Sequence, residues 1–358
     1  MKIGRRALAL ALSLALLCSC APMEPGTQES EPMRVVRVLT LLVPNTLDQV
    51  VLEQADAFAA DAARLSGGQL VIDVRTGQSP ADALTGGEAD LAFLRNAQMA
   101  QLDERFSTFA LPFLYDDHQH LSLALNSEEL LGRLNTGLQP RGIRLLNAFY
   151  SGSAFLVSTK GELRTPSDYK GIAAALRTDN ADKLAVFSSL GARVLPYSAS
   201  AIPNMLGAQA ELLPEGADGP AEEVTVDTIE VDTEQALALE ADPNTLFFIK
   251  SYHAAAPLWL GANEQSLTSL TAYERAVLSE ACAGLLAGLE RVYTDREAAA
   301  FDELRARGVE VVEIERQQVS AVLYDSSRNL PLDPGRYLPP AYFDRRLYEI
   351  IQSYSPLS

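Results

Sequence analysis

Apolar and polar residues follow two different periods in the first hundred residues. The run at 35–43 is almost wholly apolar and predicts a buried strand, and Leu70, Ile72 and Val74 alternate as in a second strand. Between these strands, apolar residues spaced by four, three, four and three positions predict a helix with one buried face: Val51, Ala55, Phe58, Ala62 and Leu65. Another helix and a strand at 91–94 follow. Strands that alternate with helices predict an open, mainly parallel α/β sheet.

The stretch 148–192 predicts a strand, a capped turn, a second strand and a helix. Thr165 is a good N-cap, with Asp168 at the acidic position of a capping box. The segment 172–177 is extended, and Asp179 can cap a helix that runs to Leu190. A strand that leads directly into a helix N-terminus commonly presents polar groups to a small ligand.

Further elements follow from local signals along the rest of the chain. They are a polar turn at 116–120, a helix near 121–135, a helix capped by Ser198 or Ser200, and a strand-like alternation at 225–231. Thr271 and Glu274 form a capping box that opens a long amphipathic helix, expected to contain a break and to last until Gly308. A strand at 309–314 and a final helix at 342–354 complete the prediction.

The N-terminal residues have the pattern of a lipoprotein export signal. Three basic residues precede an apolar run at 7–17 that is too short for a stable membrane span. The run ends in Leu17-Cys18-Ser19-Cys20, which predicts a signal peptide at 1–19 and a lipid on Cys20; an ordinary signal peptide with chance cysteines is the alternative. Proline and glutamate at 20–33 predict a disordered tether. The protein is therefore expected outside the cytoplasm, in the periplasm or at the cell surface, anchored by lipidated Cys20.

Charge and cysteine content exclude several classes of protein. The formal net charge is −18, and removal of 1–19, with three basic residues and no acids, would make it −21. So large an excess disfavours nucleic acid and anionic lipid surfaces as partners. Only Cys20 and Cys282 would remain, so that no disulfide within the chain is expected once Cys20 is lipidated. Cys282 lies on an apolar helix face and is predicted to be a core thiol.

Motifs for catalysis, metals or cofactors are missing from the sequence. It has no glycine-rich phosphate loop, no paired zinc histidines and no nucleophile elbow, so we predict that the protein is not an enzyme and holds no cofactor. His118 and His120 would point to opposite sides of an extended turn, and no third metal ligand is evident. Between 194 and 249 there are eleven acids and no Lys or Arg. We expect these acids to form a solvent-exposed face, and a cation site is the alternative.

Several motifs occur in the order found in one family. They are GGQL at 67–70, GEAD at 87–90, LPFLY at 111–115, LRTPSDYKG at 163–171, His253 with Pro257, and LTAYERAVL at 270–278. Over about 35–315 the chain resembles the periplasmic solute-binding proteins of tripartite ATP-independent periplasmic (TRAP) transporters. The resemblance implies a two-lobe α/β fold of the periplasmic-binding-protein type, with crossing strands and a long bracing helix. A solute would be held in the cleft and delivered to a TRAP membrane permease.

The same resemblance implies lobe boundaries. One lobe would comprise 34–152 plus about 224–257, and the other 153–223 plus about 258–320. The tail at 321–358 would place its helix on the lobes. A lipid-anchored ligand sensor and a non-transporting surface interaction protein are the alternative functions for this fold.

The chain departs from the family at the residues that usually clamp a carboxylate. The family's two arginines correspond to Ala154 and Ala175 here. Arg177 lies two residues beyond Ala175, on the same face of the strand, and either replaces them or is a surface arginine. A cleft without those arginines should hold a dianion poorly. The expected solute is a monocarboxylate on Arg177, or a neutral or cationic molecule, rather than a dicarboxylate.

Lobe geometry suggests further cleft residues. Ligands of open α/β sheets sit beyond the carboxyl ends of the strands. This favours residues that follow the predicted strands: Asn45, Gln78, Arg95 and Asn96. The resemblance adds Phe149 and Tyr150, which sit where the family has an aromatic wall, and Asp218, which lies in a stretch at 218–222 that looks like the family's hinge motif. The lone tryptophan, Trp259, is predicted to pack in the core.

Overall fold

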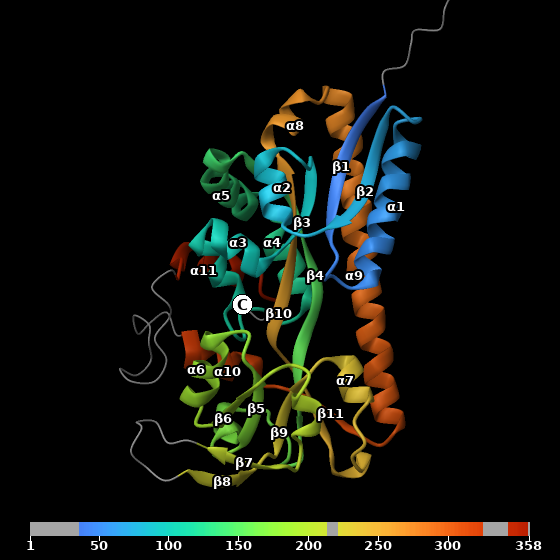
Figure 1. Ribbon diagram of the computed structural model, residues 1–358. Helices are drawn as coiled ribbons and strands as arrows, with labels where there is room; N and C mark the ends of the chain where they lie inside the picture. Colours follow the sequence, from blue (N-terminus) through green and yellow to red (C-terminus); the bar gives the residue numbers. More distant parts are fainter. Residues whose placement is uncertain (1–35, 213–220, 325–342, 357–358) are drawn as a thin grey trace, which may run out of the picture. The chain divides into compact units, whose positions relative to one another are not determined.

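We describe the fold from a computed structural model that defines residues 36–212, 221–324 and 343–356 (Figure 1). The predicted signal peptide at 1–19, Cys20, the predicted tether at 20–33 and Asp218 lie outside these described residues. Within the described ranges, no helix is long and apolar enough to cross a membrane.

A nine-stranded sheet forms the centre of the described part of the chain. Its order is β2 (Leu70–Gly77), β1 (Arg37–Pro44), β3 (Leu91–Arg95), β10 (Phe247–Asn263), β4 (Ile143–Ser158), β9 (Thr228–Val231), β5 (Ala173–Arg177) and β6 (Arg193–Tyr197), with β11 (Glu310–Glu313) beside β10. We call β1, β2 and β3 the first strand group, and β5, β6 and β9 the second. Strands inside each group are parallel, whereas β10 is antiparallel to β3 and β4 is antiparallel to β9.

The long strands β4 and β10 run through both groups (Figure 1). They pair antiparallel, and the pairing is irregular between Ile249 and Ala254 and again before Pro257. Gly152 on β4 and Tyr252 on β10 have positive φ angles of 97° and 42°. Only glycine adopts this region without strain, so Gly152 suits the bend, whereas Tyr252 is held there by its surroundings.

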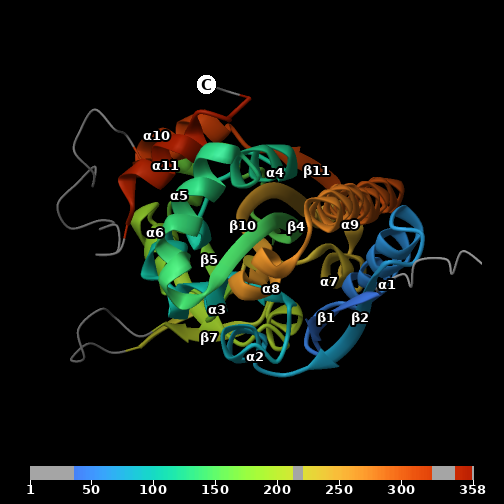
Figure 2. The same ribbon diagram turned by 90° about the horizontal axis from the view of Figure 1, so that it is seen from above.

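Two helices lie side by side and brace the sheet (Figures 1 and 2). Helix α1 (Gln49–Leu65) buries four of the five residues predicted from the sequence, and α9 (Ala272–Ala306) contacts α1, β4, β11 and α7 (Thr233–Leu237). The capping box of Thr271 and Glu274 is present, as predicted. The predicted break in α9 is wrong, because the helix continues for 35 residues.

Other helices and strands form where the sequence predicts them, but their bounds or divisions differ. The capped turn at Pro166–Tyr169, the strand β11 and the last helix α11 (Arg345–Gln352) are confirmed. The helix predicted near 121–135 is two helices, α4 (His118–Leu125) and α5 (Glu128–Leu138), because Ser127 caps a new start. The remaining helices are α2 (Pro80–Gly86), α3 (Asn96–Leu102), α6 (Ala181–Ser189), α8 (Glu264–Ser269) and α10 (Arg316–Tyr324).

Two local predictions are wrong, and a third, the strand at 225–231, is confirmed in kind but divided. Asn180, and not Asp179, caps α6, since its side chain accepts the Lys183 N–H. No α-helix follows Ser198 or Ser200, where only a short 3-10 turn forms at Ile202–Asn204. The alternation at 225–231 belongs to two strands, the end of β8 (Glu222–Thr225), which pairs with β7 (Gln209–Leu212), and β9.

The core between β10 and the helices of the first strand group contains Trp259. Its ring centroid lies 5.1 Å from that of Phe106 and 5.2 Å from that of Phe109, and its indole N–H donates to Asn96 Oδ1 at 3.1 Å. The predicted core position of Trp259 is confirmed. Cys282 is also buried as predicted, and burial raises the pKa of its thiol to about 12, which makes it a poor nucleophile.

Candidate functional site

A cavity of about 620 Å³ lies where α9 passes from the first strand group to the second. We call it the α9 cavity. Its walls come from the start of α1, the bend of β4, α7 and one face of α9: Asp48, Ser151, Gly152, Ser153, Asp232, Thr233, Glu234, Leu237, Tyr293, Arg296, Glu297, Ala299, Ala300 and Glu303. Segments that follow β1 and β9 therefore face each other across it. This size is in the usual range for a small-molecule site.

Arg296 connects the two sides of the α9 cavity. Its Nη1 donates to Asp48 Oδ2 at 2.7 Å, and its Nη2 donates to Glu234 Oε1 at 3.2 Å. Asp48 caps α1, and Glu234 lies on α7. Burial opposes ionisation of Asp48, but hydrogen bonds from the Val50 N–H and from Arg296 lower the pKa of its carboxyl. The Arg296 guanidinium therefore forms ion pairs with two carboxylates.

Glu297 is the most enclosed acid of the cavity wall, with 6% of its surface exposed. One carboxylate oxygen accepts a hydrogen bond from the Tyr150 hydroxyl, and the other accepts one from the Tyr252 hydroxyl at 3.5 Å. Burial raises the pKa of Glu297 to about 7, against the lowering effect of the two tyrosines. The carboxyl therefore joins α9 to both crossing strands and is near its titration midpoint at neutral pH.

Arg177 lies at the end of β5, next to the cavity wall. Its Nη2 donates to Asp232 Oδ2 at 3.2 Å and to Gln235 Oε1 at 2.7 Å. Its backbone N–H donates to Glu230 Oε2 at 2.7 Å. The side chain is 20% exposed, so Arg177 is not a free surface arginine, and part of its guanidinium is already engaged.

Behind Arg177 lies a buried ion pair. Lys183 Nζ donates to Glu230 Oε1 at 2.8 Å and to Asp179 Oδ1 at 2.7 Å, and the side chains of Lys183 and Glu230 are each 1% exposed. Burial raises the pKa of Glu230, but the nearby His253 and Lys183 outweigh this effect and bring it to about 2. Burial lowers the pKa of His253, whose Nε2 lies 3.7 Å from Glu230 Oε1.

The predicted solvated face of the acidic segment is wrong at two positions. Glu230 is paired with Lys183, and Asp227 is buried, with its carboxylate accepting the Ala173 N–H at 3.1 Å. In the described part of the chain, no group of three or more His, Cys, Asp or Glu could hold a metal ion. His118 and His120 lie in the first turn of α4 and not in an extended turn, and His120 Nε2 faces the Ile351 carbonyl at 2.8 Å.

The other predicted cleft residues do not line the α9 cavity. Asn45 and Gln78 are exposed, and Arg95 donates to the Thr46 carbonyl. Asn96 uses its amide in the core, donating to the Phe106 carbonyl and accepting from Trp259. Phe149 is fully buried with its ring centroid 5.8 Å from that of Phe93. Ligand contacts for these residues stay a prediction, and so does one for Tyr150, which reaches the cavity through Glu297.

Sequence reasoning missed Arg296 and Glu297, although one signal was present. The buried stripe of α9 continues through Tyr293, Glu297, Ala300, Phe301 and Leu304. Glu297 thus occupies a core position in the helical repeat. An acid at such a position is costly unless it is partnered, and this marks it as a candidate functional residue.

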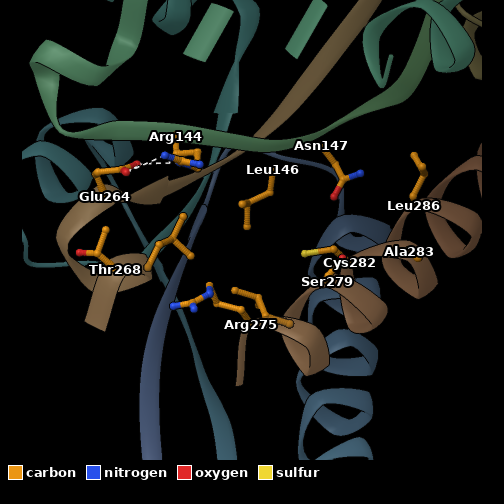
Figure 3. Close-up of a pocket in the computed structure, with 12 residues that line it drawn as sticks. Arg144, Leu146, Asn147, Glu264, Thr268, Arg275, Ser279, Cys282, Ala283 and Leu286 are labelled. Atoms are coloured by element: carbon orange, nitrogen blue, oxygen red, sulfur yellow. Dashed lines mark hydrogen bonds and ion pairs between the residues drawn. The ribbon is translucent and has the colours of Figure 1, made fainter. Parts of the chain in front are cut away.

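A second pocket, of about 510 Å³, lies between β4, α8 and α9 (Figure 3). We call it the α8 pocket. Arg144 donates to both carboxylate oxygens of Glu264 at one side, and the Cys282 thiol lies on the α9 wall. None of its lining residues lines the α9 cavity.

The chain is similar in sequence to known bacterial solute-binding proteins. The sequence profile of bacterial extracellular solute-binding protein family 7 matches residues 45–208. The 2,3-diketo-L-gulonate-binding periplasmic protein of Escherichia coli K12 is 22% identical over 256 residues, which cover 71% of this chain and 72% of that protein. The predicted resemblance to TRAP solute-binding proteins is confirmed.

Solved TRAP periplasmic solute-binding proteins share the fold. The protein from Rhodobacter sphaeroides has a TM-score of 0.69 and 15% identity, and the match covers 89% of this chain and all of that one. The galactonate-bound protein from Advenella mimigardefordensis has a TM-score of 0.59 and 20% identity, covering 90% of this chain and 99% of that one. The two-lobe α/β fold is confirmed. The TRAP-type relatives bind solutes and are not enzymes, in agreement with the prediction.

Proposed function

We propose that the protein captures one small organic solute in the α9 cavity and delivers it to the membrane subunits of a TRAP transporter. The observation that carries this proposal is the position of the cavity between the two strand groups, in a TRAP-type fold. Export, a lipid on Cys20 and a tether at 20–33 would hold the protein at the membrane, on the side where it meets solutes.

The crossing strands give the fold a place to bend. Their pairing is irregular near Tyr252, and β4 bends at Gly152, which itself lines the cavity. A solute that contacts both Asp48 and α7 would favour the arrangement that brings them together. The ion pairs of Arg296 with Asp48 and Glu234 would act in the same direction.

The solute class follows from the residues that replace the family's arginine clamp. Galactonate and β-D-glucuronate are bound in TRAP-type structures, and both are acids. Ala154 and Ala175 are buried in this chain and offer no charge. We therefore favour a monocarboxylate held by Arg177, or a neutral or cationic solute, over a dicarboxylate. Since Asp232 and Gln235 already occupy Arg177 Nη2, the monocarboxylate would have to use its remaining donors.

A thermal-shift screen tests the proposal. The purified chain is screened against monocarboxylates, dicarboxylates, sugars, amino acids and polyamines. A true solute at a hundred times its dissociation constant should raise the free energy of unfolding by about 2.7 kcal/mol. A folded protein that none of these classes stabilises would contradict the proposed function.

Arg177→Ala separates the modes of capture. If an acid stabilises the protein through Arg177, the variant should lose that stabilisation, because the Arg296 guanidinium in the cavity wall is already paired with Asp48 and Glu234. Arg75→Ala, which removes an exposed arginine paired with Asp73, is the matched control and should keep it. Stabilisation that survives in both variants would assign the solute to other residues of the cavity.

A further inference from the structure

We propose that the solute of the α9 cavity carries a positively charged amine and that Glu297 is its anionic partner. This inference rests on the proposed function, because it names the class of solute for the same cavity. It starts from a count of the charges that face the cavity and from the partners that each charge already has.

Acids outnumber cations in the cavity wall by five to one. Arg296 is the cation of the wall, and it is shared between Asp48 and Glu234. The wall acid Asp232 is paired with Arg177, and the wall acid Glu303 is paired with Arg307 at 2.9 Å. An anionic solute would therefore meet guanidinium groups whose charge is already shared with acids, and at Arg177 it could use only the donors that Asp232 and Gln235 leave. A cationic solute displaces nothing and gains attraction from the excess of acids.

Glu297 is the wall acid with which a cationic solute would form an ion pair. Among the described residues it takes part in no ion pair, although it is nearly fully buried and lines the cavity. The hydroxyls of Tyr150 and Tyr252 hold its two oxygens in place but bring no positive charge. A buried carboxylate without a cation is costly, so a fixed one at a cavity wall is a prepared site for an ammonium group.

The cations that the structure places near Glu297 are paired with other acids, so a solute could supply the positive partner of its carboxylate. On β10, Lys250 lies toward Glu297, but its ammonium pairs with Glu313 at 2.5 Å. On α9 itself, the Arg296 guanidinium is directed to Asp48 and Glu234. From β4 and β10 come the two tyrosine hydroxyls, and from α7 the acids Asp232 and Glu234 line the same cavity.

Tyr293 offers a second contact to an amine. It lines the cavity one turn before Glu297, and its ring centroid lies 6.3 Å from that of Tyr150. The face of a tyrosine ring attracts a cation and repels an anion. The aromatic and the acidic parts of the wall therefore favour the same charge on the solute.

Proton release should accompany binding of such a solute. Because burial holds the pKa of Glu297 near 7, a fraction of the carboxyl is protonated at neutral pH, and an ammonium group requires the ionised form. Below pH 7 the proton must leave when the amine binds. Affinity should therefore rise between pH 6 and pH 8, approaching about tenfold per pH unit on the acid side.

Isothermal titration calorimetry of the purified chain tests the proposal. The probes are a panel of diamines and amino alcohols led by putrescine, and a panel of acids led by succinate and galactonate. We expect binding from the amine panel, with affinity higher at pH 8 than at pH 6. Glu297→Gln should weaken it at least thirtyfold and remove its pH dependence. The control Glu280→Gln, an exposed acid on the same helix, should change neither.

The outcomes separate this inference from the proposed function. Binding from the acid panel that Glu297→Gln leaves unchanged would overturn the amine inference and leave solute capture intact. Amine binding that keeps its affinity and pH dependence in a folded Glu297→Gln variant would also overturn it. Absence of binding from both panels would contradict the proposed function itself.

Discussion

Lys183→Met should lower the free energy of unfolding by about 3–5 kcal/mol at pH 7. The substitution leaves Glu230 buried and ionised without the ammonium that lies 2.8 Å away in the native protein. Loss of one partner of a buried ion pair is much more costly than loss of both, because the remaining charge keeps its desolvation penalty. Urea unfolding of the variant and the native protein measures the difference.

The double variant Lys183→Met/Glu230→Gln is the control for this first prediction. It removes both charges and keeps an oxygen that can accept the Arg177 N–H. It should recover most of the lost stability. A loss below about 1 kcal/mol for Lys183→Met would contradict the buried pair, since exposed pairs have effects of that size.

The same pair predicts a pH dependence. The pKa of Glu230 in the folded protein, about 2, is below its ordinary value of 4.5. A lowered folded pKa contributes stability that is present above pH 4.5 and is lost as the pH falls toward 2. The difference between the native protein and Lys183→Met should therefore shrink across this window.

Trp259→Ala should lower the free energy of unfolding by about 3–5 kcal/mol. The indole packs against the rings of both Phe106 and Phe109 and is fully buried, so truncation leaves a large cavity beside these rings. It also removes the donor to Asn96 Oδ1. Urea unfolding monitored by far-ultraviolet circular dichroism avoids dependence on the lost tryptophan fluorescence.

Trp259→Phe separates packing from hydrogen bonding. It keeps a ring packed against Phe106 and Phe109 and loses the N–H donor, so we expect a loss of about 1–2 kcal/mol. Equal losses for the two variants would show that the hydrogen bond, and not the packing of the ring, carries the stability at this position.

Local patterns were enough to predict much of the fold. The four-three spacing from Val51 onward predicted α1, and the capping box at Thr271 predicted the start of α9. The apolar run at 35–43 predicted β1. Each signal lies within a few residues of the element that it specifies. The order of motifs over 35–315 showed a resemblance to the TRAP family, and this resemblance predicted the two-lobe architecture. No single element indicates that architecture by itself.

Contacts between distant segments could not be predicted in this way. Glu230 belongs to a segment rich in acids, and its partners in the core, such as Lys183 47 residues earlier, are distant in the sequence. Glu297 becomes a cavity residue because β4 and β10 bring Tyr150 and Tyr252 to it from positions 147 and 45 residues away. Sequence reasoning placed the cleft at strand ends, where Arg177 does border the cavity, but it did not consider the face of the bracing helix.

The most direct test of the account is a crystal structure of the protein with the strongest binder from the solute panels. The account predicts one solute in the α9 cavity, with an amine beside the Glu297 carboxylate and a further contact to the Tyr293 ring. A solute bound in the α8 pocket, or held by Arg95 outside the α9 cavity, would contradict it.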